Sequence, residues 1–263
     1  MMNISKYLLS LALFASSANA STTLTPENTV TFRGEVSGES VGRAILQIET
    51  AGVKSKGEPI YFVLDSPGGS VLAGLDLVTY LKATDHNIVC VVKTAISMAY
   101  AILQACPTRS VTEYGITMQH VMSLESGGRE PNLLTFVNFI HSIATKLDQE
   151  QADRVGVSLK KFRDLTVRDW WSLGKQAKDN NTVDTLETYT CSPALYAKTV
   201  VKTAETMFGS VKATFSACPL VGVPLSAEMK LRPGIAHSAE SEAAKNAAID
   251  TFSPYSKALE SIK

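Results

Sequence analysis

The sequence lacks the features that mark several common functional classes. Its 263 residues include 25 basic and 25 acidic side chains, so charge gives no reason to expect nucleic acid or an anionic membrane as a partner. Its four cysteines lack zinc-type spacing, and we expect no metal and no cofactor. It has no GxxxxGK[ST] phosphate-binding loop, so nothing in the chain would supply energy from ATP.

The N-terminal apolar run is short. Residues 7–14 are largely apolar, Lys6 precedes them, and Ala18-Asn19-Ala20 follows. This pattern is typical of a secretory signal peptide with an AxA cleavage site, whereas a membrane-spanning anchor needs about 20 apolar residues. We therefore expect a signal peptide over residues 1–20 and an exported, periplasmic mature protein in an oxidising compartment.

A glycine turn between a buried strand and a helix is the first candidate for chemistry. Residues 60–64 (IYFVL) are typical of a strand buried on both faces. The motif SPGGS at residues 66–70 follows, and then Val71, Leu75 and Val78 recur at helical spacing. Backbone N–H groups at such a turn, beside a helix N-terminus, favour negative charge and could form an oxyanion site. The alternative is a tight turn with no chemical role.

The next unit repeats this arrangement and places a serine at the joint. Residues 87–92 are typical of a second buried strand and residues 98–103 of a second helix, with Ser97 between them. Ser97 could cap the helix, or present its hydroxyl where ligands of α/β folds gather. Parallel strands joined by right-handed crossovers would bring both turns to one edge of the sheet.

Four motifs in order resemble those of the proteolytic subunit of the Clp protease and its relatives in the Clp/crotonase superfamily. They are DSPGGSV at residues 65–71, ISMA at 96–99, MQH at 118–120 and TVRD at 166–169. The resemblance covers roughly residues 28–187. It implies an α/β fold built from repeated β-β-α units around a parallel sheet.

The resemblance also implies a role for each matching residue. Ser97 would be the nucleophile, His120 the general base and Asp169 the group that orients the histidine. The backbone N–H groups of Gly69 and Met98 would form the oxyanion hole. Gly68 and Ser70 would contribute to substrate binding.

Two of these assignments have structural alternatives. A histidine after a strand is often a packing residue, and His120 gains its candidate role from its position relative to Ser97. Asp169 could be a helix-start carboxylate, with Asp153 and Asp164 as rivals for the orienting role. The tryptophan pair that follows Asp169 would help to bury an orienting carboxylate.

The longest helical pattern covers residues 133–155, where apolar residues recur at helical spacing from Leu134 to Leu147. Such a helix could pack in the core. The resembled family instead uses it to join rings of subunits, which implies a homo-oligomeric ring.

We expect three segments: the signal peptide (1–20), a peptidase domain (21–188) and a helical C-terminal extension (189–263) that includes a helix over residues 239–252. Cys90 lies about 13 Å back along its strand from the joint and Cys106 about 14 Å along the helix, so both reach the same end of the unit. We therefore predict disulfides between Cys90 and Cys106 and between Cys191 and Cys218, with buried free thiols as the alternative.

The sequence thus predicts an exported serine endopeptidase that cleaves unfolded or short polypeptides and works without an ATPase partner. Two alternatives stay open. One is a catalytically silent oligomeric scaffold of the same fold. The other is an acyl-CoA enzyme of the crotonase type, which an exported location disfavours.

Overall fold

A mixed six-stranded sheet forms the centre of the protein in the computed structural model, which describes residues 21–124 and 126–252. The strand order is β2-β3-β4-β5-β6, and the short strand β7 also pairs with β5. Strands β2 to β5 are parallel and β6 is antiparallel to β5. The strand bounds are β2 (Thr29–Arg33), β3 (Ile60–Ser66), β4 (Ile88–Ile96), β5 (Thr108–Gln119), β6 (Trp170–Leu173) and β7 (Thr185–Leu186). The predicted signal peptide lies outside the described residues.

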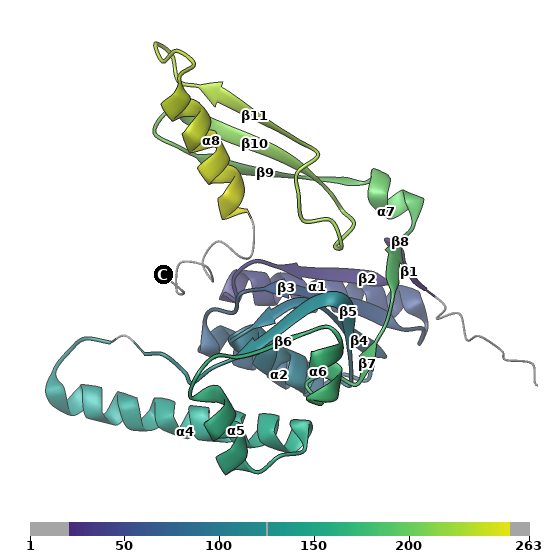
Figure 1. Ribbon diagram of the computed structural model, residues 1–263, viewed down its shortest axis with the longest axis vertical. Coiled ribbons are helices and arrows are strands. Elements are labelled where there is room, and N and C mark those ends of the chain that lie inside the picture. The colour runs from purple at the N-terminus through teal and green to yellow at the C-terminus, as the bar shows by residue number, and fades with distance from the viewer. Residues whose placement is uncertain (1–20, 125, 253–263) are drawn as a thin grey trace, which may run out of the picture.

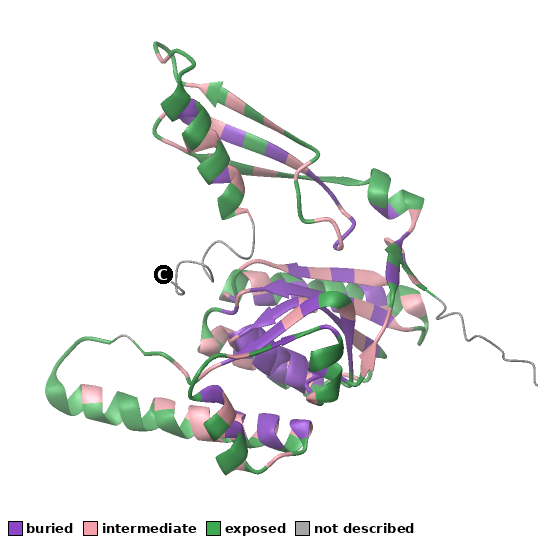
Figure 2. Cartoon of the chain, viewed as in Figure 1, coloured by how far each residue is buried: buried purple, intermediate pink, exposed green. Residues whose placement is uncertain are grey.

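Helices α1 (Gly38–Ser55), α2 (Val71–Ala83) and α3 (Met98–Ala105) pack against one face of this sheet (Figure 1). Their buried residues join those of the strands in a single core that includes Ile48, Phe62, Leu77 and Ile102. Figure 2 shows that burial concentrates in the main sheet, and the residues of α3 from Met98 to Gln104 are all buried. The uninterrupted apolar runs of β3 and β4 are explained by this packing, because both of their faces are covered.

The β3-α2 and β4-α3 units place both predicted turns at the same sheet edge. Strands β3 and β4 run parallel, with Ser66 opposite Ala95 in the register. Helix α2 begins directly after the glycine turn and α3 directly after Ser97. The α/β fold and the common edge expected from the sequence are therefore present.

A long helix, α4 (Glu130–Val155), projects from the domain, and α5 (Leu159–Thr166) packs beside its C-terminal part (Figure 1). The buried residues of α4 are confined to its C-terminal third, from Leu147 onward. The apolar residues nearer its N-terminus face solvent, Leu134 being 61% and Phe139 53% exposed. The alternative that the whole helix packs in the core is therefore wrong.

The prediction that residues 189–263 are helical is also wrong. Short elements β8 (Tyr189–Cys191) and α7 (Pro193–Ala197) lead into an antiparallel sheet of β9 (Thr199–Glu205), β10 (Gly209–Ser216) and β11 (Ser226–Leu231). Val211, Ala213 and Phe215 are buried at a spacing of two, which requires a strand. The expected final helix is present as α8 (Ala239–Thr251). Residues 253–263 lie outside the described part of the chain.

The C-terminal segment covers the second face of β3 and β4 in the main sheet. Strand β1 (Thr22–Leu24) pairs with β8, and Leu195 and Cys218 pack with Val63 and Val91 of the sheet. Both predicted disulfides are present: Cys191–Cys218 holds this cover together, and Cys90–Cys106 joins β4 to the end of α3.

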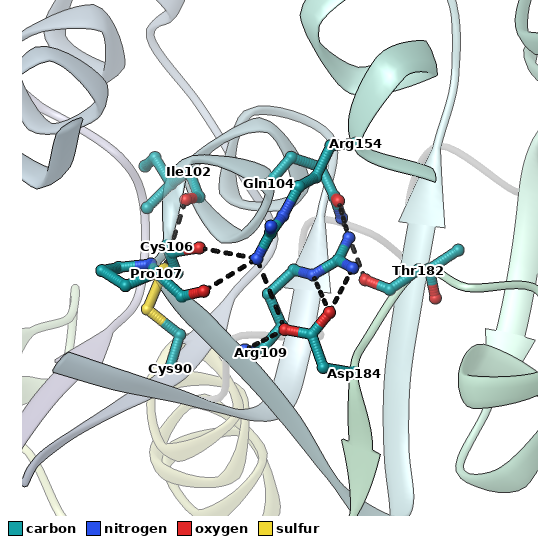
Figure 3. Close-up of a disulfide and its surroundings, with 9 residues drawn as sticks. All are labelled: Cys90, Ile102, Gln104, Cys106, Pro107, Arg109, Arg154, Thr182 and Asp184. Carbon is teal, nitrogen blue, oxygen red and sulfur yellow. Dashed lines mark hydrogen bonds and ion pairs between the residues drawn. A yellow bond between two sulfur atoms is a disulfide. The ribbon is translucent and has the colours of Figure 1, made fainter. Parts of the chain in front are cut away.

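Arg109, a buried arginine near the start of β5, connects β5 to α3 and to the residue before β7 by hydrogen bonds (Figure 3). Arg109, only 2% exposed, donates to the carboxylate of Asp184 and to Gln104 Oε1. Arg154 from α4 donates to the carbonyl oxygens of Cys106 and Pro107. Burial acts to raise the pKa of Asp184, but the hydrogen bonds from Arg109 outweigh it and hold the pKa below its ordinary value of 3.8.

We expect Asp184→Asn to lower the free energy of unfolding at pH 7 by about 3 kcal/mol, because it leaves the buried Arg109 charge without its partner. Because the pKa of Asp184 is lower in the folded state than in the unfolded state, its carboxylate stabilises the fold at pH values above the unfolded-state pKa. This contribution is lost as the pH falls through the folded-state pKa. Urea titrations should therefore show the difference between parent and variant shrinking below pH 4. Asp179→Asn, which removes an exposed pair with Lys175, should change stability by under about 0.5 kcal/mol. Equal losses in the two variants would contradict this account.

Candidate active site

The glycine turn is held by backbone contacts that exclude side chains. Gly68 and Gly69 adopt φ values of 91° and 142°, which L-residues rarely reach. A Cβ at Gly68 would lie 2.7 Å from the Ile96 carbonyl oxygen and 2.9 Å from the Met98 nitrogen. The two turns therefore touch directly, and this contact fixes the distance between the candidate oxyanion loop and Ser97.

The segment before α1 holds the outer side of the glycine turn. Val36 donates its N–H to the Gly68 carbonyl and accepts from the Ser70 N–H, at 2.7 and 2.9 Å. Gly69 lies between these two residues, so its own N–H points away from Val36. Gly69 lines the same cleft as Ser97, Met98 and His120. Gly68 and Ser70, expected at the substrate site, lie outside that lining, and the Ser70 side chain caps α2 by accepting from Ala73 N–H.

Ser97 has a strained backbone and an available hydroxyl. Its φ and ψ are 56° and −120°, a conformation that costs free energy for a non-glycine residue and recurs at functional sites. Its N–H donates to the Met118 carbonyl at 2.9 Å. Although Ser97 occupies the N-cap position of α3, its side chain makes no capping hydrogen bond. The interpretation of this serine as a helix cap is therefore wrong.

His120 lies directly after β5 and faces Ser97. Its Nε2 is 2.9 Å from Ser97 Oγ, within reach for proton transfer. The backbone N–H of His120 donates to Gln119 Oε1, and Gln119 Nε2 donates to Gln151 Oε1 on α4. This link between β5 and α4 orients the segment that carries the histidine. Gln119 and Gln151 were not predicted from the sequence, where only the position of Gln119 next to His120 could have drawn attention to it.

Backbone donors are available beside the serine hydroxyl. Met98 is the first residue of α3, and the first N–H groups of a helix have no partner within it. A Cβ at Gly68 would lie 2.9 Å from the Met98 nitrogen, so this donor lies next to the glycine turn. The site thus combines a hydroxyl, an imidazole and the backbone N–H groups of Gly69 and Met98, which are the groups that acyl transfer requires.

Asp169 lies near His120 but does not contact it. The β5-β6 ladder ends with the pair Gln119 and Trp170, and His120 and Asp169 are the residues that directly adjoin this last pair. Asp169 is exposed, so the expectation that the tryptophan pair buries it is wrong. Within residues 21–124 and 126–252, no hydrogen bond or ion pair joins His120 to an aspartate. The rival Asp164 pairs with Lys160, and the rival Asp153 accepts from Gln149.

Two further properties concern the described residues as a whole. They contain no group of three or more His, Cys, Asp or Glu side chains arranged to hold a metal ion. None of the helices in this part of the chain has the length and apolar character needed to cross a membrane.

We expect Gly68→Ala to abolish labelling of the protein by a fluorophosphonate, because its Cβ would displace the backbone of residues 96–98. Gly34→Ala is a matched control, since Gly34 has a similar φ of 95° but nothing within 4 Å of the added Cβ. Gly34→Ala should lose about 1 kcal/mol of stability from backbone strain and keep its labelling, whereas Gly68→Ala should lose more stability, because of the added clash, and lose its labelling. Labelling of Gly68→Ala at the parent rate would show that the contact is not required.

Comparisons with known proteins agree with the motifs. A model of the Clp protease family matches residues 15–189. The ATP-dependent Clp protease proteolytic subunit 1 of Prochlorococcus marinus is 27% identical over 160 residues, covering 59% of this chain and 81% of that protein. The ATP-dependent Clp protease proteolytic subunit of Oltmannsiellopsis viridis is 31% identical over 141 residues, covering 51% and 71%. The family match spans more than half of the chain, covers all of residues 21–188 and includes Ser97, His120 and Asp169, so the chain belongs to the Clp protease family.

Proposed function

We propose that this protein is an exported serine endopeptidase that hydrolyses peptide bonds in unfolded or short polypeptides. The observation that carries the proposal is the 2.9 Å approach of His120 Nε2 to Ser97 Oγ, on a serine whose backbone is strained and whose hydroxyl does not cap its helix. A structural serine has no need of either feature. Together they match an activated nucleophile.

In the proposed reaction, Ser97 Oγ attacks the scissile carbonyl carbon while its proton passes to His120 Nε2. The tetrahedral oxyanion accepts hydrogen bonds from the N–H groups of Gly69 and Met98. As the intermediate collapses, His120 gives the proton to the leaving amine and an acyl-enzyme forms. Water then attacks the ester with His120 as base, which releases the second product and restores the serine.

Asp169 is the proposed orienting carboxylate. It directly precedes Trp170, which pairs with Gln119, the residue before His120, and neither rival aspartate adjoins a residue of this ladder. The missing contact is consistent with catalytic hydrogen bonds that are long or misaligned in an unliganded enzyme and tighten on binding substrate. Such tightening would need only a local change, since Asp169 lies in the short turn between α5 and β6.

We propose export because residues 1–20 have the pattern of a signal peptide. Export would in turn limit which substrates the enzyme can cleave. ATP is not expected beyond the membrane, so no ATPase partner would unfold substrates there. The enzyme would then cut only chains that are already unfolded, and compact domains would be spared.

The two alternative functions make different demands on the site. A silent scaffold would not require the strained Ser97 or its approach to His120. An acyl-CoA enzyme would require coenzyme A in the same compartment as the protein and would not depend on this Ser-His pair. Hydrolysis of a disordered protein by the purified chain separates the proposal from both.

We expect mature protein to cleave a disordered test protein without nucleotide, and added ATP to change nothing. Ser97→Ala should reduce turnover by a factor on the order of 10⁶ while circular dichroism stays unchanged. Ser123→Ala is the matched control, because Ser123 lines the same cleft but has no hydrogen bond to His120. Full activity of Ser97→Ala would eliminate the mechanism, and cleavage only with an added ATPase would contradict the nucleotide-independent function.

Self-assembly is a second part of the proposal. Helix α4 exposes Leu134, Phe136, Val137 and Phe139 along its projecting half. Apolar side chains gathered on one projecting element are a typical interaction surface. A second copy of the chain is the proposed partner, in line with the ring assembly implied by the resemblance.

We expect the parent to sediment as an oligomer at micromolar concentration and Phe139→Asp to shift it toward the monomer. Val53→Asp is the control, because Val53 is 79% exposed on α1, away from this surface. Both variants should keep the parent's melting temperature within a few degrees. A monomeric parent that still labels at Ser97 would refute the assembly.

A further inference from the structure

A second hollow, separate from the active-site cleft, lies between β2, α1 and the C-terminal sheet. Its volume is about 650 Å³, within the range that holds sizeable ligands. It shares no lining residue with the cleft around Ser97. Residues of β2 and α1 line one side of it, and residues of α7, β9 and β10 line the other. We call this region the β2 groove.

One wall of the β2 groove is an unpaired strand edge. Strand β2 ends the main sheet, and β3 is the only strand paired with it among the described residues. Asn28 C=O and Gly34 N–H bond to β3, so the even-numbered residues face β3. The N–H and C=O groups of Thr29, Thr31 and Arg33 therefore point away from it, and all three residues line the groove. Such an edge can accept an added strand.

The walls of the groove are predominantly basic. Its lining side chains include Arg33, Arg43, Lys54, Lys198 and Lys202, against the single acidic residue Glu27. Asp65 pairs with Arg33 and Glu39 pairs with Arg43. The three lysines have no carboxylate within ion-pair distance in the described part of the chain. Lys202 Nζ lies over the rings of Phe215 and Phe252, at 5.6 and 5.8 Å from their centroids. Burial and the nearby Arg33 charge lower its pKa, against the opposing effect of Asp65.

The groove is closed at one end. Arg33 donates to the carbonyl oxygens of Pro219 and Val221, which brings the loop after Cys218 across the end of β2. A ligand that runs along the edge would therefore enter from the Thr29 end. Apolar side chains such as Val200 and Phe215 supply contact surface on the opposite wall.

We propose that the β2 groove binds an extended, acidic polypeptide segment that adds as a strand to the free edge of β2. The unpaired edge selects an extended backbone, and the lysines on the two walls select acidic side chains. This site goes beyond the proposed function, because binding there does not depend on hydrolysis at Ser97. On an active peptidase it would hold acidic substrates near the enzyme.

The test uses the full mature chain carrying Ser97→Ala, so that the probe stays intact. The probe is a fluorescent eight-residue peptide of alternating threonine and glutamate, and binding is followed by anisotropy at low and moderate salt. We expect saturable binding that weakens as salt rises. A threonine-lysine peptide of the same length should not bind. A threonine-glutamate peptide with alternate backbone nitrogens methylated should bind at least tenfold more weakly.

Matched variants separate the groove from general electrostatic attraction. Lys54→Glu with Lys198→Glu changes exposed residues on opposite walls and should weaken binding at least tenfold. Lys212→Glu with Lys230→Glu makes the same charge change on exposed residues of the C-terminal sheet outside the groove, and should leave affinity within about twofold. Thr31→Pro removes one outward N–H at a position that tolerates proline, and should also weaken binding.

Three results would overturn the proposal: no binding by the acidic probe at millimolar concentration, equal losses in the two double variants, or full binding by the methylated probe. The methylated probe decides the question of strand addition even if Thr31→Pro does not fold. Fluorophosphonate labelling of chains with native Ser97 reports the active site independently. The groove substitutions should leave that labelling unchanged, so failure of one site is distinguishable from failure of the other.

Discussion

The structure depends on one close backbone contact at the edge of the main sheet. Gly68 approaches Ile96, Ser97 and Met98 so closely that no side chain fits between the two turns. The contact arises because β3 and β4 are parallel neighbours that end at the same sheet edge, with Ser66 opposite Ala95. It joins the glycine turn to a serine held at positive φ. The Ser97 and His120 geometry is then completed by β5, which ends one strand further along the sheet.

The C-terminal segment extends this arrangement and adds a surface of its own. It buries the second face of β3 and β4 through Leu195 and Cys218, with the Cys191–Cys218 disulfide holding the cover together. Arg33 connects the same segment to β2 and to buried Asp65, only three residues before Gly68. A chain that ended with the peptidase domain would lack both this cover and the outer wall of the β2 groove.

The sequence was most informative where a local pattern determines topology. Continuous apolar runs before SPGGS and before Ser97 predicted parallel strands, and parallel strands bring their C-terminal ends to one edge. The disulfide between Cys90 and Cys106 followed from the lengths of a strand and a helix. The C-terminal sheet was missed because its alanine- and threonine-rich sequence hides the alternation of Val211, Ala213 and Phe215. The orientation of Asp169 depends on the turn between α5 and β6, and the β2 groove on elements far apart in the chain, so neither could be predicted from local patterns.

The central claim is that His120 activates Ser97 as a nucleophile. The most direct measurement is mass-spectrometric mapping of the adduct formed by a fluorophosphonate on the mature protein and on His120→Ala. The account predicts one adduct, on Ser97, in the parent and none above background in the variant, with the two proteins equally folded. An adduct on another residue, or equal modification of Ser97 without the histidine, would contradict it.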